Sequence, residues 1–382
     1  MKTIKLYDEN AYIREFEAEV ISCEKSGKYY AVTLDKTAFF PEGGGQKSDK
    51  GTLSGVKVCD VKEKDGEIIH YTQELLSGTV KGEIYWDARF DRMQNHSGEH
   101  IVSGLIHKYT GADNVSFSLT DGECTLAFNT AIGDELIEKV EREANRIVFE
   151  NRKIKCYYPS AEELKTLEYR SKLELTENVR LVEIEGADLC ACCAPHCKST
   201  AEIGLIKIIS KENYKAGGTK LFIACGMRAL EHHKMLLTQV KDISHLLCAK
   251  IEKTAAAVER LKNEKEKCEY ELVGLKRKNI EKAVESISPS EENIIITCEF
   301  NGDDLRLFAD KLKTKVKGIV LVLEGDDNGG YRYVLTSGNS DISPIVKPAN
   351  TALNGRGGGR DNMARGNYSA KFADIKNYFE NL

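Results

Sequence analysis

The sequence His-Ser-Gly-Glu-His occupies residues 96–100, and Cys-Cys-Ala-Pro-His occupies residues 192–196. If the first segment is helical, its two histidines are one turn apart and both imidazoles project from the same face. The second segment adds the thiolate of Cys192 and the imidazole of His196. Three nitrogens and one sulfur form a tetrahedral ligand set that suits zinc. The two segments together therefore predict one metal site built from distant parts of the chain.

Length and composition limit the classes of protein to which this chain can belong. Its 382 residues are too many for one ordinary core and indicate about two to four domains. Hydrophobic residues make up 41% and charged residues 30% of the chain, as in ordinary globular proteins. No apolar run approaches the roughly 20 residues that span a bilayer, and the charged segment 1–16 lacks the apolar centre of a signal peptide. We therefore expect a cytoplasmic protein with no membrane association.

The charge and the cysteines narrow these classes further. The net charge of −5 argues against a protein that coats nucleic acid, but it leaves room for a local basic surface that grips one RNA. Twelve cysteines in a long chain without a leader favour reduced thiols and a metal site over disulfides. Four cysteines crowd together, so an all-thiolate structural site is an alternative to the mixed site. They are Cys190, Cys192, Cys193 and Cys197.

Residues 1–88 predict a small β-barrel domain. Short alternating segments recur here at the spacing typical of small barrels, separated by Gly, Asp and Lys. The expected strands are 18–23, 29–34, 56–61, 67–71 and 79–84. Between the second and third strands lie three consecutive glycines, Gly43, Gly44 and Gly45, which cannot form a strand interior. They predict a loop whose backbone can approach a ligand closely.

Residues 89–227 predict an α+β metal-binding domain. A helical pattern covers 90–111 and carries the two histidines of the first metal segment. A second amphipathic helix is expected over 132–151, with strands before and after it. The cysteine-rich segment is expected to lie in a loop, 188–200.

Residues 228–287 predict a long helical linker, and residues 288–382 predict a small α/β domain. Apolar residues from Leu247 to Leu275 recur at spacings of four and three, which is typical of a coiled-coil seam. Gly274 is a candidate interruption of this helix. The seam serves either as an internal spacer or as the interface of a homodimer. The last domain is expected to read β, α, β, β, then a Gly-rich loop within 353–366, then a final helix.

Several segments, in this order, resemble the editing region of alanyl-tRNA synthetase and its free-standing relatives, the AlaX proteins. They are residues 39–46, 49–51, 89–100, 192–196, 200–204 and 217–219. This resemblance covers residues 1–227. The Gly-rich stretch resembles the DHH-associated domain that ends many alanyl-tRNA synthetases, so the chain as a whole is similar to the long AlaX class. It departs from the family at Cys-Cys-Ala-Pro-His, where Cys-Gly-Gly-Thr-His is usual, but the ligand spacing is the same.

The resemblance implies a zinc-dependent, trans-editing aminoacyl-tRNA deacylase. Such an enzyme hydrolyses the ester bond of mischarged Ser-tRNA(Ala), and Gly-tRNA(Ala) is a second candidate substrate. The implied partner is tRNA(Ala) that carries the wrong amino acid, and the implied cofactor is one Zn²⁺ per chain. The implied ligands are His96, His100, Cys192 and His196.

The resemblance also implies residues that contact the substrate. Seryl and alanyl esters differ by one hydroxyl, and a site that hydrogen-bonds this hydroxyl can reject the substrate that lacks it. Thr37 is the family's candidate partner for the hydroxyl, and Gln46 is expected to contact the substrate or the terminal adenosine. The backbone amides of residues 43–45 are expected to reach the ligand. Gln94 is expected to help orient the substrate.

The Gly-Arg run near the C-terminus has two interpretations. Arg356, Arg360 and Arg365 lie among glycines and are either a flexible charged loop or a flat, positive surface for tRNA phosphates. We expect the second, with the C-terminal domain holding the tRNA body while the metal domain takes the 3′ end.

Other functions remain open from the sequence. A non-catalytic tRNA-binding or metal-sensing protein on the same fold is one alternative, and a metallohydrolase for a small ester is another. The histidines of the first segment could also be two satisfied helix residues beside an unrelated cysteine loop. Glu99 is expected to be solvated or to lie behind the ligands, and His107 to be a packing residue.

Overall fold

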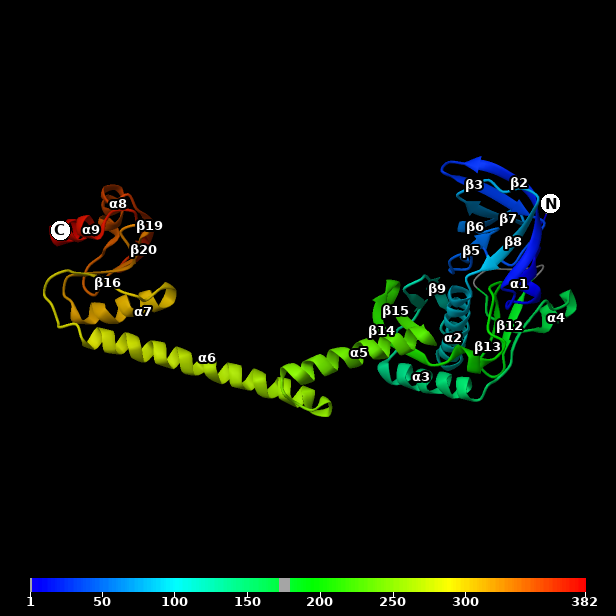
Figure 1. Ribbon diagram of the computed structural model, residues 1–382. Coiled ribbons are helices and arrows are strands. Elements are labelled where there is room, and N and C mark those ends of the chain that lie inside the picture. Colours follow the sequence, from blue (N-terminus) through cyan, green and yellow to red (C-terminus); the bar gives the residue numbers. More distant parts are fainter. Residues whose placement is uncertain (1, 172–178) are drawn as a thin grey trace. The chain divides into compact units, whose positions relative to one another are not determined.

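The computed structural model describes residues 2–171 and 179–382, which form two compact units, residues 1–242 and residues 243–382 (Figure 1). The expected mixture of helices and several β-sheets is confirmed. The finer division into four domains stays a prediction. Within the described residues, no helix is long and apolar enough to cross a membrane.

Six strands of the first unit pair in a closed order, so that each strand is hydrogen-bonded to two neighbours. The order is β2–β3–β7–β6–β5–β8. Their bounds are β2 Glu15–Ser26, β3 Tyr29–Leu34, β5 Gly51–Leu53, β6 Val56–Lys64, β7 Glu67–Thr72 and β8 Thr79–Ile84. Alternate residues point inward and form one apolar cluster, as the period of a strand requires. Sequence reasoning missed β5, which is only three residues long and yet joins β6 to β8.

A short parallel pair lies beside the ring. It consists of β1 Ile4–Lys5 and β4 Lys36–Thr37, and the one-turn helix α1 Leu6–Glu9 follows β1. This pair places Thr37 at the start of the segment that leads to the triple glycine.

The rest of the first unit is built around the helix α2 Trp86–Thr110, which lies between two sheets (Figure 1). One sheet has the order β14–β15–β10–β9 and the other the order β11–β12–β13. The strands are β9 Asn114–Leu119, β10 Cys124–Phe128, β11 Ile154–Tyr157, β12 Leu181–Ile184, β13 Asp188–Ala191, β14 Ile206–Tyr214 and β15 Gly218–Cys225. The other helices are α3 Asp134–Phe149 and α4 Ala161–Thr166, with 3₁₀ turns at Thr200–Ile203 and Lys215–Gly217. The middle of α2 is buried on all sides, which is why its polar residues must find partners inside the protein.

The long linker is two helices rather than one. Helix α5 Met227–Leu246 ends before Cys248, which has a φ of 48° in the left-handed region where a helix cannot continue. A 3₁₀ turn at Ile251–Lys253 precedes α6 Thr254–Glu285. The expectation of one continuous seam from Leu247 is therefore wrong at its first two positions, whereas Gly274 lies inside α6 and does not interrupt it.

The second unit contains one five-stranded sheet of order β16–β17–β18–β20–β19. The strands are β16 Ile294–Thr297, β17 Ile319–Asp326, β18 Gly330–Ser337, β19 Arg356–Arg360 and β20 Met363–Tyr368. Helices α7 Gly302–Leu312, α8 Ser343–Ala352 and α9 Phe372–Glu380 pack against it, with a 3₁₀ turn at Lys313–Lys315. The expected β, α, β, β order is confirmed. Two features differ from expectation. Helix α8 was not expected, because it contains Pro344 and Pro348. The Gly-Arg run forms the edge strand β19 and not a loop.

His70 is a fully buried histidine inside the ring, and its titration should couple stability to pH. Burial lowers the pKa of His70 to about 4, against the opposing effect of its hydrogen bond with the Val32 carbonyl. The unfolded chain takes up this proton near pH 6.5, so stability from this group is present above that pH and is lost as the pH falls toward 4. We expect wild type to lose about 2 kcal/mol more than His70→Gln between pH 7 and pH 5 in urea unfolding. His233→Gln, at an exposed histidine on α5, should lose as much as wild type; equal losses for wild type and His70→Gln would contradict the assignment.

Candidate metal centre

Helix α2 places two imidazoles side by side. His96 and His100 are four residues apart, and their rings are stacked with centroids 5.3 Å apart. Both side chains are buried. Gly98 lies between them, and a Cβ there would come within 2.3 Å of the Cys225 sulfur, so only glycine lets α2 pack this closely on β15.

The segment after β13 brings the other two donors to the same place. The donor atoms of Cys192 and His196 and those of the two helix histidines all lie within 4.8 Å of one another. The His196 ring is 4.8 Å from each of the other two imidazoles, measured between centroids. The structure therefore assembles the predicted quartet, which could hold a metal ion.

Each of the three imidazoles has its Nδ1 atom engaged by a different neighbour. The Nδ1 of His96 is 2.7 Å from the Gln46 Oε1, that of His100 is 2.8 Å from an Asp188 carboxylate oxygen, and that of His196 is 3.1 Å from the Ser97 Oγ. These contacts direct the Nε2 atoms inward: those of His96 and His196 lie 3.6 and 3.3 Å from the Cys192 sulfur. Partners of this kind fix the tautomer and ring orientation of metal-binding histidines.

The protonation states of the quartet also suit a bound cation. Burial, with His100 and His96 nearby, holds the pKa of His196 well below 6.5, so this imidazole is neutral and free to donate a lone pair. Desolvation, and then the neighbouring Cys193, raise the pKa of the Cys192 thiol well above 9.0. A cation beside the sulfur would reverse this effect and stabilise the thiolate. Three neutral nitrogens and one thiolate are the donors expected for zinc.

Two arginines that sequence reasoning missed support the quartet. Arg180 is buried and donates to the carbonyls of Cys192 and Ala194, at 3.0 and 2.9 Å, which fixes the ligand loop. Arg170 donates two hydrogen bonds of 2.7 Å to Asp188. Although burial acts to raise it, the bonds from His100 and Arg170 hold the pKa of Asp188 below its usual value, so it remains a carboxylate. No signal in the sequence links either arginine to the ligands.

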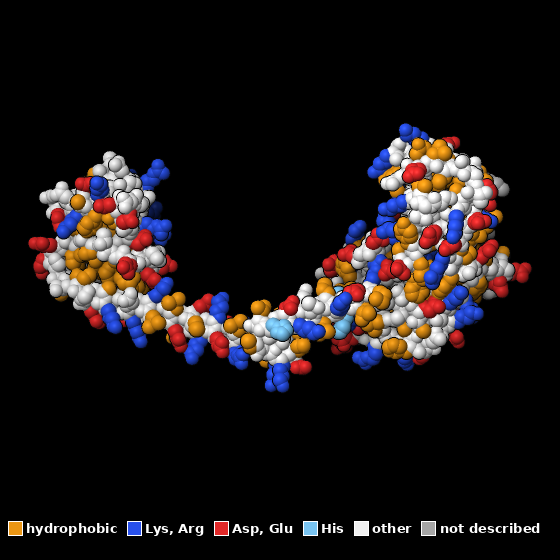
Figure 2. Space-filling view, in the orientation of Figure 1, with side chains coloured by type: hydrophobic (Ala, Val, Ile, Leu, Met, Phe, Trp, Pro, Cys, Tyr) orange, Lys and Arg blue, Asp and Glu red, His pale blue; other side chains and the backbone are white. Residues whose placement is uncertain are grey.

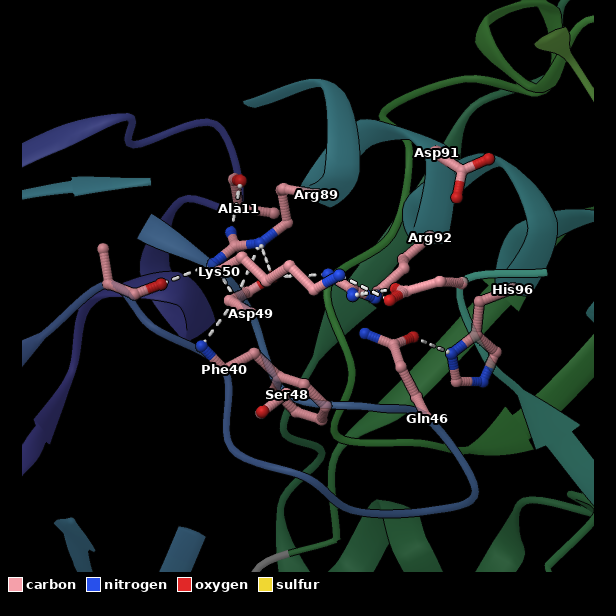
Figure 3. A network of polar contacts seen from close by, with 12 residues as sticks. Ala11, Phe40, Gln46, Ser48, Asp49, Lys50, Arg89, Asp91, Arg92 and His96 are labelled. Carbon is pink, nitrogen blue, oxygen red and sulfur yellow. Dashed lines mark hydrogen bonds and ion pairs between the residues drawn. The ribbon is translucent and has the colours of Figure 1, made fainter. Parts of the chain in front are cut away.

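The Gly-rich loop reaches the quartet through Gln46. Figure 3 shows the Gln46 oxygen pointing to His96 while its amide nitrogen points away from that ring. Within the described residues this buried Nε2 has no hydrogen-bond partner, so a donor is left over beside the quartet. Gly45 has a φ of 88°, and a Cβ there would lie 2.3 Å from the Phe117 carbonyl oxygen. Gly44 is also in the left-handed region, so the backbone requires glycine at the second and third positions of the triple glycine.

A buried ion pair anchors the far end of this loop (Figure 3). Asp49 accepts two hydrogen bonds of 2.9 Å from the Arg89 Nε and one of 2.6 Å from the Phe40 backbone N–H. Arg89 also donates to the Ala11 and Ala38 carbonyls. Both charged side chains are fully buried, and the pair joins the loop to α2.

Two expected substrate contacts are occupied by the protein itself. The Thr37 hydroxyl is buried, lies 2.9 Å from the His70 Nε2, and accepts a bond of 3.1 Å from the Phe39 N–H. Gln94 donates to the Glu202 carbonyl at 2.9 Å, and its amide lies against Gly226. Their roles in substrate binding stay predictions.

The structure also places Glu99, His107 and the cysteines of the alternative all-thiolate site. Glu99 is buried behind the ligands, where Ser103 and Asn114 donate to its carboxylate. His107 is half-exposed near the end of α2 and lies 3.0 Å from the Ala112 carbonyl, so it is not a core residue. Among the residues that the structure describes, the only candidate groups are the quartet and a second group formed by His100, Asp188 and Cys190, so no all-thiolate cluster is present there.

Comparison with known proteins finds similarity to proteins that are named for alanyl-tRNA. Residues 179–220 match the family model described as "Threonyl and Alanyl tRNA synthetase second additional domain". In particular, the chain is 28% identical to the alanyl-tRNA editing protein AlaX-L of Pyrococcus horikoshii, over 97% of this chain and 96% of that protein. These similarities confirm the resemblance to the long AlaX class.

Alanine–tRNA ligases are also similar to nearly the whole chain. The ligase of Pyrococcus abyssi is 31% identical over 96% of this chain, and that of Methanococcus maripaludis is 28% identical over 96%. The chain spans 42% of the length of each ligase. A solved structure of the C-Ala domain from Aquifex aeolicus alanyl-tRNA synthetase matches 24% of this chain and 86% of that domain, at 21% identity and a TM-score of 0.21, which is too low to support a fold assignment.

The quartet predicts a selective effect of cysteine substitution on metal content. Cys192→Ala removes one of four ligands and should weaken zinc binding by at least about 100-fold, because replacing even an outer partner costs 10- to 100-fold. Cys193→Ala, at the exposed neighbouring residue, is the matched control and should keep one zinc per chain. Zinc per chain in purified protein, followed by competition with a chelator, measures both. Equal loss in the two variants would support a cysteine-only site.

Proposed function

We propose that this protein is a zinc-dependent deacylase that hydrolyses the ester of Ser-tRNA(Ala), with Gly-tRNA(Ala) as a second substrate. The observation that carries the proposal is the hydrogen bond between Gln46 and His96, which joins the metal quartet to the Gly-rich loop. The similarity to a protein named for alanyl-tRNA editing along nearly its whole length supports the choice of substrate.

The residues around the quartet suit an ester that is already activated. A bound Zn²⁺ would supply either polarisation of the ester carbonyl or a fixed point that orients the α-amino group. The unpaired Gln46 Nε2 can donate to an oxygen of the substrate, since its own carbonyl is used by His96. The backbone of Gly43, Gly44 and Gly45 can approach the substrate without side chains in the way.

The contacts of Thr37 determine how it would recognise serine. The His70 Nδ1–H donates to the Val32 carbonyl, which leaves Nε2 to accept the proton of the Thr37 hydroxyl. The hydroxyl oxygen also accepts from the Phe39 N–H, so one lone pair remains. A seryl hydroxyl would therefore donate to Thr37. An alanyl ester offers no such donor, which is the basis for sparing the correct product.

The deacylase proposal predicts fast release of serine from Ser-tRNA(Ala) and slow release of alanine from Ala-tRNA(Ala). Cys192→Ala should lose activity, while Cys193→Ala should retain it. Acid-stable radioactivity on the tRNA measures each rate. Binding of charged tRNA without release of any amino acid would instead indicate a tRNA-binding or metal-sensing protein. Equal hydrolysis of a serine ester that lacks the tRNA body would indicate a small-ester hydrolase.

We also propose that the C-terminal arginines bind tRNA phosphates. On β19, Arg356 and Arg360 alternate with Gly358, so all three lie on one face, and Arg365 on β20 is paired directly opposite Gly358. The three arginines are exposed, and within the described residues none forms an ion pair. A Cβ on Gly358 would meet nothing within 4 Å, whereas one on Gly357 would lie 2.5 Å from the Tyr333 hydroxyl. The glycines therefore allow close packing on one face and leave the other open between three positive charges.

This surface should contribute to tRNA affinity and not to the chemical step. Replacing Arg356, Arg360 and Arg365 together with alanine should raise KM for Ser-tRNA(Ala) at least about tenfold with little change in kcat, and should reduce the salt dependence of binding. The control removes three exposed cations of α6, Arg260, Lys262 and Lys267, which have carboxylate partners one turn away. A fall in kcat at unchanged KM would contradict the proposal.

The remaining expectations stay proposals. We propose that the six-stranded ring is the small barrel expected for residues 1–88. We also propose that the protein is cytoplasmic. A homodimer would use the exposed residues of α6, where apolar side chains lie among interspersed charges (Figure 2). From Val258 to Leu275 the seam keeps the coiled-coil spacing, and Lys265 and Cys268 are the seam residues that weaken a dimer interface.

A further inference from the structure

Two aromatic rings on the first unit are each covered by a cation. The Lys198 Nζ lies 4.2 Å from the ring centroid of Tyr12, and the guanidinium carbon of Arg14 lies 4.2 Å from that of Trp86. The two rings are 5.5 Å apart, and Phe90 stacks on Trp86 with an interplanar angle of 25°. We refer to Tyr12, Arg14, Trp86 and Lys198 as the aromatic–cation cluster.

The cations of this cluster are available to a ligand. Both side chains are exposed, and in the parts of the chain that the structure describes neither Arg14 nor Lys198 forms an ion pair. A carboxylate close by, on Glu202, is occupied by the Tyr12 hydroxyl and by the backbone N–H of Lys198. Positive charge is therefore presented beside aromatic faces without an internal partner, in a protein whose net charge is −5.

The cluster is tied to the metal quartet through both of its segments. Lys198 follows the ligand His196 by two residues. Trp86 is the first residue of α2, ten residues before His96, which is about 15 Å along the helix at 1.5 Å per residue. At about 3.4 Å per stacked nucleotide, this distance corresponds to about four nucleotides.

We propose that the aromatic–cation cluster binds the single-stranded 3′ end of the tRNA, upstream of the nucleotide that carries the amino acid. Bases would replace Arg14 on the ring face of Trp86 and Lys198 on that of Tyr12, and the displaced cations would pair with the phosphates between these bases. Alternating aromatic rings and cations are what proteins use to hold single strands without reading their sequence. The inference rests on the proposed function, because it takes a tRNA end as the substrate, but it assigns residues that lie outside the quartet and the Gly-rich loop.

The chain contains one tryptophan, so Trp86 reports on its own surroundings. We expect an uncharged RNA tetranucleotide, 5′-ACCA-3′, to quench the fluorescence of the zinc-loaded protein in a saturable manner. Arg14→Ala and Lys198→Ala should each weaken binding about five- to tenfold and lower the salt dependence by about one phosphate contact. An oligomer of the same length without bases should bind poorly and leave the fluorescence unchanged.

Lys139→Ala is the matched control, because Lys139 is exposed and lies 3.8 Å from the ring centroid of Tyr109 elsewhere in the same unit. It should leave binding of the tetranucleotide unchanged. The proposal is overturned if the RNA fails to quench Trp86, if the base-free oligomer binds equally well, or if the control weakens binding as much as Arg14→Ala.

Deacylation measured on the same variants separates this inference from the proposed function. Serine release with an unchanged KM in both Arg14→Ala and Lys198→Ala would support the deacylase proposal and show that the cluster does not bind the substrate. Quenching by RNA with no deacylation of any charged tRNA would support the cluster as a nucleic-acid-binding surface and contradict the deacylase proposal.

Discussion

The arrangement of the first unit depends on the buried ion pair between Asp49 and Arg89. Its two members come from the loop after the triple glycine and from α2, and they also fix Phe40, Ala11 and Ala38 by backbone hydrogen bonds. Breaking a pair of this kind leaves an uncompensated buried charge, which costs about 3–5 kcal/mol. Arg89 lies seven residues before His96 on the same helix, so the pair sets both the rotation and the axial position of α2 against the ring. The quartet and the Gly-rich loop meet because this contact places their supporting elements.

The quartet is then adjusted by partners from separate parts of the fold. Gln46 belongs to the loop of the ring, Asp188 to the three-stranded sheet, and Ser97 to α2 itself. Each fixes one imidazole, so the ring orientations do not depend on a single neighbouring element. Arg180 and Arg170 add a further layer by holding the ligand loop and the Asp188 carboxylate. The structure thus has a rigid donor set supported on several sides, as precise chemistry requires.

Local patterns in the sequence indicated the four residues of the quartet but not their partners. The spacing of His96 and His100 has a direct meaning on a helix, and the motif around Cys192 supplied the other two donors, so the quartet could be predicted. Asp188, Arg180 and Gln46 acquire their roles only through long-range packing, which leaves no periodic signal; Gln46 was chosen through the family resemblance. The errors have local causes. The left-handed Cys248 separates two helices where the heptad pattern begins, and Gly357 of β19 lies against Tyr333 across the sheet rather than in a turn.

The hydrogen bond between Gln46 and His96 has a thermodynamic consequence for the proposed activity. Gln46 contacts His96 with its oxygen and has an unpartnered nitrogen, so under the proposed function the two ends of one planar amide would contact a metal ligand and the substrate. Any preference of a bound ion for one orientation of this amide is felt equally by the substrate, and the reverse holds to the same degree, because coupling between two sites is reciprocal. Under the proposed function, a substrate that favours the same orientation of this amide as the ion should slow the exchange of the ion. Metal supply and substrate supply would in this way set a joint threshold for activity.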